Sequence, residues 1–419
     1  MEGKPHSSQT YNTAGRMSWM KQDLGLPINK EKAAAGFDLV WSIISDAFKH
    51  SNENCANIAP NVSLKDLFRE KLAERSLSHD DRNLVLQLAE MWGAFVGDSW
   101  ERQSLKWFWL EECLDGENLF IADTHHAILQ RMAKSAMRDA DIHLSKTATS
   151  IEDRKGKDKD PRVLIRTEHC DFEFDEVVVT RDASYSRLEK VYIAFPVAFW
   201  DSPLPGAPNA DSTSPTTSAS FPSFAHFLHP TYVPDQQKSW TVELNLLSSA
   251  AVFGNRAQPV LLFTIYGPCA THVTSLIAPF SLASTQYFDV LNDFFRPYYS
   301  LLPNYVADHP DCFPSAVLAT NWQNDDLAGN GSYTNFQISS EVGNAEEEVL
   351  LDEDVRELRA GMPEHGIWFA GEHTAPFVAL GTSTGAYWSG ESVGIRILGA
   401  NGLLAKCSKD PNPNADVLP

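Results

Sequence analysis

The C-terminal part of the chain contains the stretch that decides the fold, which reads GIWFAGEHT at residues 366–374 and GTSTGAYWSG at residues 381–390. The apolar run that ends in Gly-Glu is typical of a short buried strand. A glycine-rich entry then precedes apolar residues at helical spacing, among them Val393 and Ile397. The sequence therefore predicts a strand, a loop over residues 375–380 and a helix, in that order.

Small residues mark the point where this loop enters the helix, at residues 381–386. Glycine lets a ligand approach the backbone closely, and the N–H groups at a helix N-terminus favour a negative group. A reduced flavin carries negative charge on the pyrimidine edge of its ring, so this stretch is a candidate for holding the ring end of a flavin. Close packing between helix and strand explains the same residues equally well, and the residues alone leave both interpretations open.

The first 140 residues have helical patterns. Apolar residues recur at helical spacing over residues 37–48, and the sequences that begin at Ser63 and Ser78 resemble capping boxes. Core packing is the expected role of the aromatic residues between positions 84 and 110. These residues include Trp92, Phe95, Trp100, Trp107 and Trp109.

The middle of the chain alternates between strand and loop patterns. A charged run at 153–161 predicts a solvated hairpin loop, a Pro/Ser/Thr-rich run at 202–223 predicts a flexible insertion, and the acidic run at 339–354 predicts a solvated surface. Further strands and helices follow from periodicity. Strands are expected at 142–151, 163–167, 172–180, 188–195, 240–247 and 260–266, and helices at 124–139 and 285–299.

Five further segments follow one another along the chain in a familiar order. They read WFWLEE at 107–112, LEKVYIAFP at 188–196, RPYY at 296–299, TNW at 320–322 and AGNGSY at 328–333. Together with the stretch 366–398, they resemble the flavin-dependent amine oxidases, in particular the branch of fungal polyamine oxidases and histone-demethylase-like proteins. The resemblance covers residues 37 to 405 in pieces.

The resemblance implies a two-domain fold, with an α/β flavin domain plus an α+β substrate domain, that lacks the N-terminal Rossmann βαβ unit. The chain is expected to cross between the domains more than once. The expected parts are a helical part of the substrate domain at 1–110, a middle part of the FAD-binding domain at 111–182, a substrate-binding domain with a mixed sheet at 183–345, the C-terminal part of the FAD-binding domain at 346–405 and a tail at 406–419.

Two features of the family are missing from the sequence. The family begins with a βαβ unit whose G-x-G-x-x-G grips the FAD pyrophosphate, and the nearest sequence here, at 329–334, has Thr in place of the third glycine. In the family, a strand such as 177–180 leads into a segment whose lysine holds a water near the flavin N5 atom. Here Arg181 follows the strand, and Lys190 belongs to the next strand's motif. We therefore expect an N-terminally truncated member of the family.

By resemblance, the chain binds FAD and oxidises a polyamine-like small-molecule amine to an aldehyde and an amine, with release of hydrogen peroxide. Catalytic residues stay unassigned, and the alternative is a non-catalytic remnant or interaction protein on the same fold. Trp322, Tyr333 and Phe377 are the expected aromatic walls of the substrate pocket, although each also fits a core position. The expected cofactor-binding residues are Gly371, Glu372, Gly381, Thr382, Ser383, Gly385 and Ala386.

Charge and composition exclude several other classes of protein. The chain has 419 residues, and 34 Lys and Arg against 55 Asp and Glu give a formal net charge of -21. This charge disfavours nucleic acid and anionic membranes as partners and suits a polycationic substrate. No apolar run approaches the roughly 20 residues of a membrane span. Six scattered cysteines without a C-x-x-C, and histidines without a third ligand at zinc spacing, predict no metal and a cytoplasmic chain.

Overall fold

A computed structural model describes residues 17–20, 28–112, 125–154, 163–180, 186–201, 224–228, 240–339 and 351–404, together with positions 204, 230 and 233. The chain divides into two compact units. Unit 1 consists of Met1–Trp109 and Ser184–Glu341, and unit 2 consists of Leu110–Ala183 and Val342–Pro419. Within the described ranges, no helix is both long and apolar enough to cross a bilayer.

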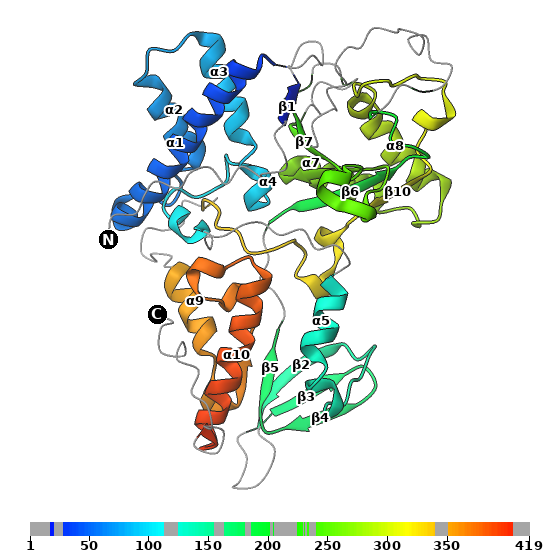
Figure 1. The fold of residues 1–419 in the computed structure, drawn as a ribbon. Helices are drawn as coiled ribbons and strands as arrows, with labels where there is room; N and C mark the ends of the chain where they lie inside the picture. The colour runs from blue at the N-terminus through cyan, green and yellow to red at the C-terminus, as the bar shows by residue number, and fades with distance from the viewer. Residues whose placement is uncertain are drawn as a thin grey trace. The chain divides into compact units, whose positions relative to one another are not determined.

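Unit 1 begins with a cluster of helices, drawn in blue in Figure 1. They are α1 (Lys30–Asn54), α2 (Leu64–Ala73), α3 (His79–Glu90) and the single turn α4 (Gly93–Val96). The predicted capping box at Ser63 is confirmed, since its hydroxyl accepts from the Asp66 N–H and the Asp66 carboxylate accepts from the Ser63 N–H. Ser78 also caps its helix: its hydroxyl accepts the Asp81 N–H (3.1 Å) and donates to the Asp81 carboxylate (2.6 Å).

The aromatic residues of this helical part are mostly buried, as predicted. Trp92, Trp100 and Trp107 lie in the interior. Phe95 is the exception: it is 40% exposed, because it lies on the short α4 turn and its ring stacks on Trp92 from the solvent side. For Phe95 the prediction of a core position was wrong.

A mixed six-stranded sheet forms the rest of unit 1. Its strands are β1 (Met17–Met20), β6 (Leu188–Ala194), β7 (Phe224–Phe227), β8 (Val242–Leu246), β9 (Val260–Tyr266) and β10 (Ala316–Ala319), in the order β1-β7-β8-β9-β6-β10. The β1–β7 pair is parallel and the others are antiparallel. One face of the sheet carries apolar side chains at alternate positions, and these pack in a core with α7 (Gly267–Ile277) and α8 (Thr285–Tyr299).

Unit 2 combines two small sheets with helices. Strands β2 (Ala148–Asp153), β3 (Val163–Thr167) and β4 (Asp171–Phe174) form an antiparallel sheet, and β5 (Val177–Val179) pairs in parallel with β11 (Ile367–Phe369). The helices are α5 (His125–Ala133), α9 (Leu351–Ala360) and α10 (Ser383–Ala400). Helices α9 and α10 lie side by side (Figure 1), and Arg396 on α10 donates to the Ala360 carbonyl at the end of α9.

Three predicted elements have different bounds in the structure. The strand expected at 172–180 is two strands, β4 and β5, which belong to different sheets. They separate at Glu176, whose carboxylate accepts hydrogen bonds from Trp368 Nε1 and Asn401 Nδ2 (2.7 and 3.0 Å) and so holds the chain to the C-terminal part of unit 2. The strand expected at 142–151 begins only at Ala148. The helix expected at 124–139 ends at Ala133, and a 3-10 turn follows.

Several predicted loops fall largely outside the described residues. They are the hairpin loop at 153–161, the insertion at 202–223, most of the acidic run at 339–354 and the tail at 406–419. Within the insertion only position 204 is described, and Leu204 is buried in the core of unit 1. The acidic run continues into α9, which begins at Leu351.

Candidate functional site

The predicted strand, loop and helix are all present in unit 2. Strand β11 pairs with β5, and the Ala370 N–H continues the pairing to the Val179 carbonyl (2.9 Å). Trp368 is buried, and its ring lies beneath the Arg396 guanidinium of α10 at 5.5 Å. These contacts fix the strand against the helix, so the loop between them has defined ends.

A hydroxyl cluster holds the first turn of this loop against α10. Gly371 has a φ of 148°, a conformation that other residues rarely adopt. Its N–H donates to the Ser389 hydroxyl (3.1 Å), and its carbonyl accepts from the Thr374 hydroxyl (3.1 Å). The two hydroxyl groups lie 2.6 Å apart. The loop therefore leaves the strand in one fixed direction.

Glu372 joins the two ends of the loop. Its side chain is buried, with 8% of the residue exposed, and its Oε2 atom accepts the N–H of Gly381 at 2.6 Å. Gly381 has a φ of 70°, in the left-handed region, where the chain turns into the helix. Thr382 then caps α10, because its hydroxyl accepts the Gly385 N–H (2.9 Å) and donates to the Ala379 carbonyl (2.7 Å). Glu372 thus supports the entry of the helix from inside the protein.

The first turn of α10 presents free backbone donors. Ser383 and Thr384 are exposed, and in the described part of the chain no group accepts their N–H bonds. The next two N–H groups, of Gly385 and Ala386, are bonded to Thr382. This 18-residue helix therefore begins with two unpaired N–H groups on exposed residues, and such an N-terminus favours a negatively charged group beside it.

Arginine side chains support the middle of the loop. Arg359 on α9 donates to the carbonyls of Thr374 and Ala375 (3.0 and 2.5 Å). Its guanidinium and that of Arg356 both lie over the Phe377 ring, at 5.0 and 5.1 Å from the ring centre. Burial, and next the charges of Arg356 and Arg396, lower the pKa of the Arg359 side chain. Phe377, a predicted substrate wall, is therefore a platform for two arginines.

The two other predicted aromatic walls belong to unit 1. Trp322 is 43% exposed and begins a 3-10 turn. The buried carboxylate of Glu189 shapes this turn, because it accepts the Gln323 N–H (3.1 Å) and the Thr320 hydroxyl (2.5 Å). The Tyr333 hydroxyl donates to the Phe95 carbonyl (2.7 Å). The seven predicted cofactor-binding residues thus gather at one place, whereas the three predicted aromatic walls are divided between the units.

Removal of the Glu372 carboxylate tests its role in the loop. We expect Glu372→Ala to lower the free energy of unfolding by about 1.5–3 kcal/mol, because a hydrogen bond to a charged acceptor is lost at a buried position. Urea titration measures this change. Glu391→Ala on the exposed face of α10 is the matched control and should change stability much less. Equal losses in the two variants would show that the bond to Gly381 is unimportant.

Sequence reasoning missed a buried polar pair in unit 1. His226 on β7 is 1% exposed, and its Nε2 atom lies 3.6 Å from Oε2 of Glu243 on β8, its partner in the sheet register. Burial lowers the pKa of His226 to about 3 and raises the pKa of Glu243 to about 7. The alternation at 242–246, in which Glu243 and Asn245 separate three apolar residues, was the signal for a second, polar face of this sheet.

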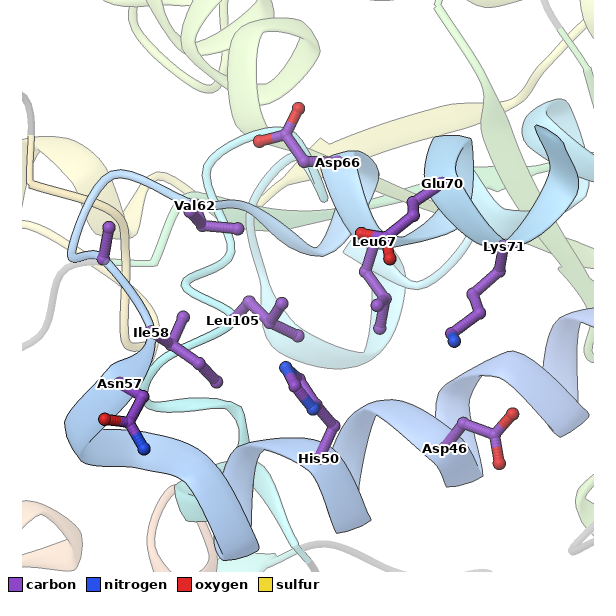
Figure 2. Close-up of a pocket in the computed structure, with 11 residues that line it drawn as sticks. Asp46, His50, Asn57, Ile58, Val62, Asp66, Leu67, Glu70, Lys71 and Leu105 are labelled. Atoms are coloured by element: carbon purple, nitrogen blue, oxygen red, sulfur yellow. The ribbon is translucent and has the colours of Figure 1, made fainter. Parts of the chain in front are cut away.

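Unit 1 also has surface pockets that contain none of the predicted residues. One, of about 450 Å³, lies between α1 and α2 and is shown in Figure 2, where Glu70 and Lys71 of α2 face His50 of α1. A second, of about 400 Å³, has Trp100, Trp240 and Tyr266 in its lining. The complete lining of the first is Asp46, His50, Asn57, Ile58, Ala59, Val62, Asp66, Leu67, Glu70, Lys71 and Leu105.

Solved structures of putrescine oxidase show the same fold as this chain. A double mutant of putrescine oxidase, made to redesign cofactor binding, matches with a TM-score of 0.59 at 12% identity, over 92% of this chain and 81% of the other. Wild-type putrescine oxidase bound to putrescine gives a TM-score of 0.57 at 12% identity, with the same coverage. Cyclohexylamine oxidase from Brevibacterium oxydans IH-35A gives 0.49 at 13% identity, over 87% and 75% of the two chains. The comparison with curated proteins gave no match.

The sequence model of a family described as flavin containing amine oxidoreductase matches residues 57–398, most of the chain. The mixed α/β fold class predicted from the sequence is confirmed by these likenesses. The predicted FAD cofactor is confirmed at the level of the family. The chain therefore belongs to the flavin-containing amine oxidoreductases.

Proposed function

We propose that this chain is an FAD-dependent oxidase of polyamine-like amines that releases hydrogen peroxide. The reaction takes a primary or secondary amine, dioxygen and water to an aldehyde, ammonia or a smaller amine, and hydrogen peroxide. When bound, the flavin would accept a hydride equivalent from the carbon beside the amine nitrogen and pass the electrons to dioxygen. The protein's part is to hold the ring, orient the amine and keep water from the reacting atoms.

The start of α10 is the observation that carries this proposal. Ser383 and Thr384 point two unpaired N–H groups outward from the helix end, which suits the negatively charged edge of a reduced flavin ring. Gly381 adds no side chain at this entry, so a planar ring can approach the backbone there. Glu372 holds this entry in place from behind. The residues present therefore fit the ring end of the cofactor.

Charge supports a cationic substrate. The formal net charge of -21 lowers the potential around the whole molecule and raises the local concentration of a polycation. One structural neighbour, putrescine oxidase, is recorded with putrescine bound. A short aliphatic polyamine is therefore the first substrate class to test.

The visible spectrum of the purified, desalted chain, with FAD supplied during expression, tests the proposal. We expect flavin absorption bands that survive desalting and that bleach under anaerobic conditions when putrescine, spermidine or spermine is added. Readmission of air should restore the bands and produce hydrogen peroxide. Bleaching by one amine and not by the others would identify the preferred chain length.

A different result would favour the second reading of the sequence. The missing G-x-G-x-x-G and lysine segment are the observations that favour a non-catalytic interaction protein on the same fold. If the protein is folded and colourless, and also fails to take up added FAD, the oxidase proposal is wrong for this chain. Far-ultraviolet circular dichroism provides the check that it is folded.

A further inference from the structure

The pocket of about 400 Å³ in unit 1 lies where the helices meet the end of the sheet. Its lining comes from α2, α3, the segment that follows α4, the start of α7, and the place where β8 begins and β9 ends. Pockets that bind small molecules typically measure about 300–1,000 Å³. This one, which we call the aromatic pocket, therefore has room for one small molecule.

Three aromatic side chains form walls of the aromatic pocket. Trp100 and Tyr266 are buried, with 3% and 6% of each residue exposed, and Trp240 is half-buried. Neighbouring groups hold two of these rings in place. The Tyr266 hydroxyl donates to the Glu90 carbonyl (2.9 Å), and the Trp100 ring lies edge to face with the Phe68 ring at 5.5 Å. The walls are thus preformed, and they suit a planar aromatic ligand.

A polar group in the same lining lacks a partner. Thr241 is only 2% exposed, and in the part of the chain that the structure describes its hydroxyl has no hydrogen-bond partner. A buried hydroxyl without a partner is unfavourable, and folded proteins provide partners for nearly all such groups. The unpaired hydroxyl therefore points to a polar group on a molecule that occupies the pocket.

The charges of the lining favour an anionic group on this ligand. The lining includes two cations on neighbouring turns of α2, Lys65 and Arg69, and two acids, Glu90 and Glu101. Lys65 forms an ion pair with Glu101. No carboxylate of the described residues lies within ion-pair distance of Arg69. An arginine binds a carboxylate through two parallel hydrogen bonds. Because a net charge of -21 disfavours multiply charged anions, a monocarboxylate fits better than a phosphate.

We propose that the aromatic pocket binds a small aromatic monocarboxylate. Arg69 pairs with the carboxylate, the ring lies against Trp100 and Trp240, and the Thr241 hydroxyl forms a hydrogen bond with a polar group of the ring. Every lining residue belongs to unit 1, and none belongs to the predicted cofactor-binding set. The inference is therefore independent of the proposed amine oxidation and adds a second ligand site to the protein.

Calorimetric titration of the full chain with indole-3-acetate tests this site. We expect Arg69→Gln to weaken binding by about tenfold, because a charge-assisted pair is lost, and to leave the weaker binding of uncharged indole unchanged. Arg75→Gln is the matched control, since it removes the same charge at an exposed position outside the lining, and it should bind as the wild type does. Acetate, which lacks the ring, should give no measurable binding.

Thr241→Val tests the hydrogen bond, because valine keeps the shape of the side chain and removes the hydroxyl. We expect this variant to bind indole-3-acetate about three- to tenfold more weakly, and to bind 1-naphthaleneacetate, which has no ring N–H, as the wild type does. Without a ligand it should melt at or above the wild-type temperature, since its hydroxyl has no partner to lose. A lower melting temperature, or equal weakening with both acids, would overturn the role of Thr241.

The outcomes separate this site from the proposed reaction. No binding of indole-3-acetate by the wild type, or equal binding by the wild type and Arg69→Gln, would overturn the aromatic pocket as a ligand site even if amines bleach the flavin. Weaker binding by Arg69→Gln but not by Arg75→Gln supports the site even if the protein is colourless. Far-ultraviolet circular dichroism of both arginine variants provides the check that they are folded.

Discussion

Gly385→Ala is expected to destabilise the protein by about 1–3 kcal/mol or more and to prevent stable FAD uptake. A Cβ atom at this position would lie 2.0 Å from the Ala379 carbonyl oxygen and 2.8 Å from the Ala375 Cβ. Both neighbours belong to the loop that Glu372 and Arg359 hold in place. Because the closest atom is backbone, no side-chain rotation relieves the contact, and the helix entry must move away from the loop.

Gly390→Ala is the matched control, in the same helix with the same chemical change. A Cβ atom at Gly390 meets nothing within 4 Å, and alanine favours a helix interior by about 0.5–1 kcal/mol over glycine. The two substitutions should thus have opposite signs in urea titration, and only Gly385→Ala should lose the flavin bands after desalting. If both variants gain stability and stay yellow, the close packing at Gly385 is unimportant.

Local sequence patterns were enough to predict most of the helices and strands. The bounds of α8 and β9 match the predicted 285–299 and 260–266, since strong periodicity and flanking breakers mark their ends. The strand expected at 172–180 failed for a nonlocal reason. Val177–Val179 follows β4 after only two residues, and the distant groups Trp368 and Asn401 hold the chain at the second of these, Glu176. A single sequence does not display such a contact.

In the candidate site, too, features made by neighbouring residues were predictable and features made by distant residues were not. Small residues at the start of α10 were visible because they are adjacent in sequence. The hydrogen bond from Gly381 to Glu372 spans a loop, and the two arginines that lie over the Phe377 ring, Arg356 and Arg359, come from another helix. Glu243 and His226 were missed because the strands that bring them together are separated by residues without a clear pattern.

Arg187→Met is expected to lower the free energy of unfolding of unit 1 by about 3–5 kcal/mol, because it leaves a buried carboxylate without its cation. Asp98 is 1% exposed, and Arg187 donates to both of its oxygens, through Nε at 2.9 Å and Nη2 at 2.7 Å. Gln337 donates to the same carboxylate at 2.9 Å. The pair therefore joins the loop after α4, the start of β6 and the segment that follows Tyr333.

Arg296→Met is the control for this prediction, since Arg296 pairs with Asp293 on the exposed surface of α8 in the same unit. An exposed pair contributes about 1 kcal/mol or less, so the two arginine variants should differ severalfold in urea titration. The double variant Asp98→Asn with Arg187→Met should recover part of the loss, because the unpaired charge is gone. If the double variant is no more stable than Arg187→Met, the loss comes from packing of the arginine side chain and not from the buried charge of Asp98.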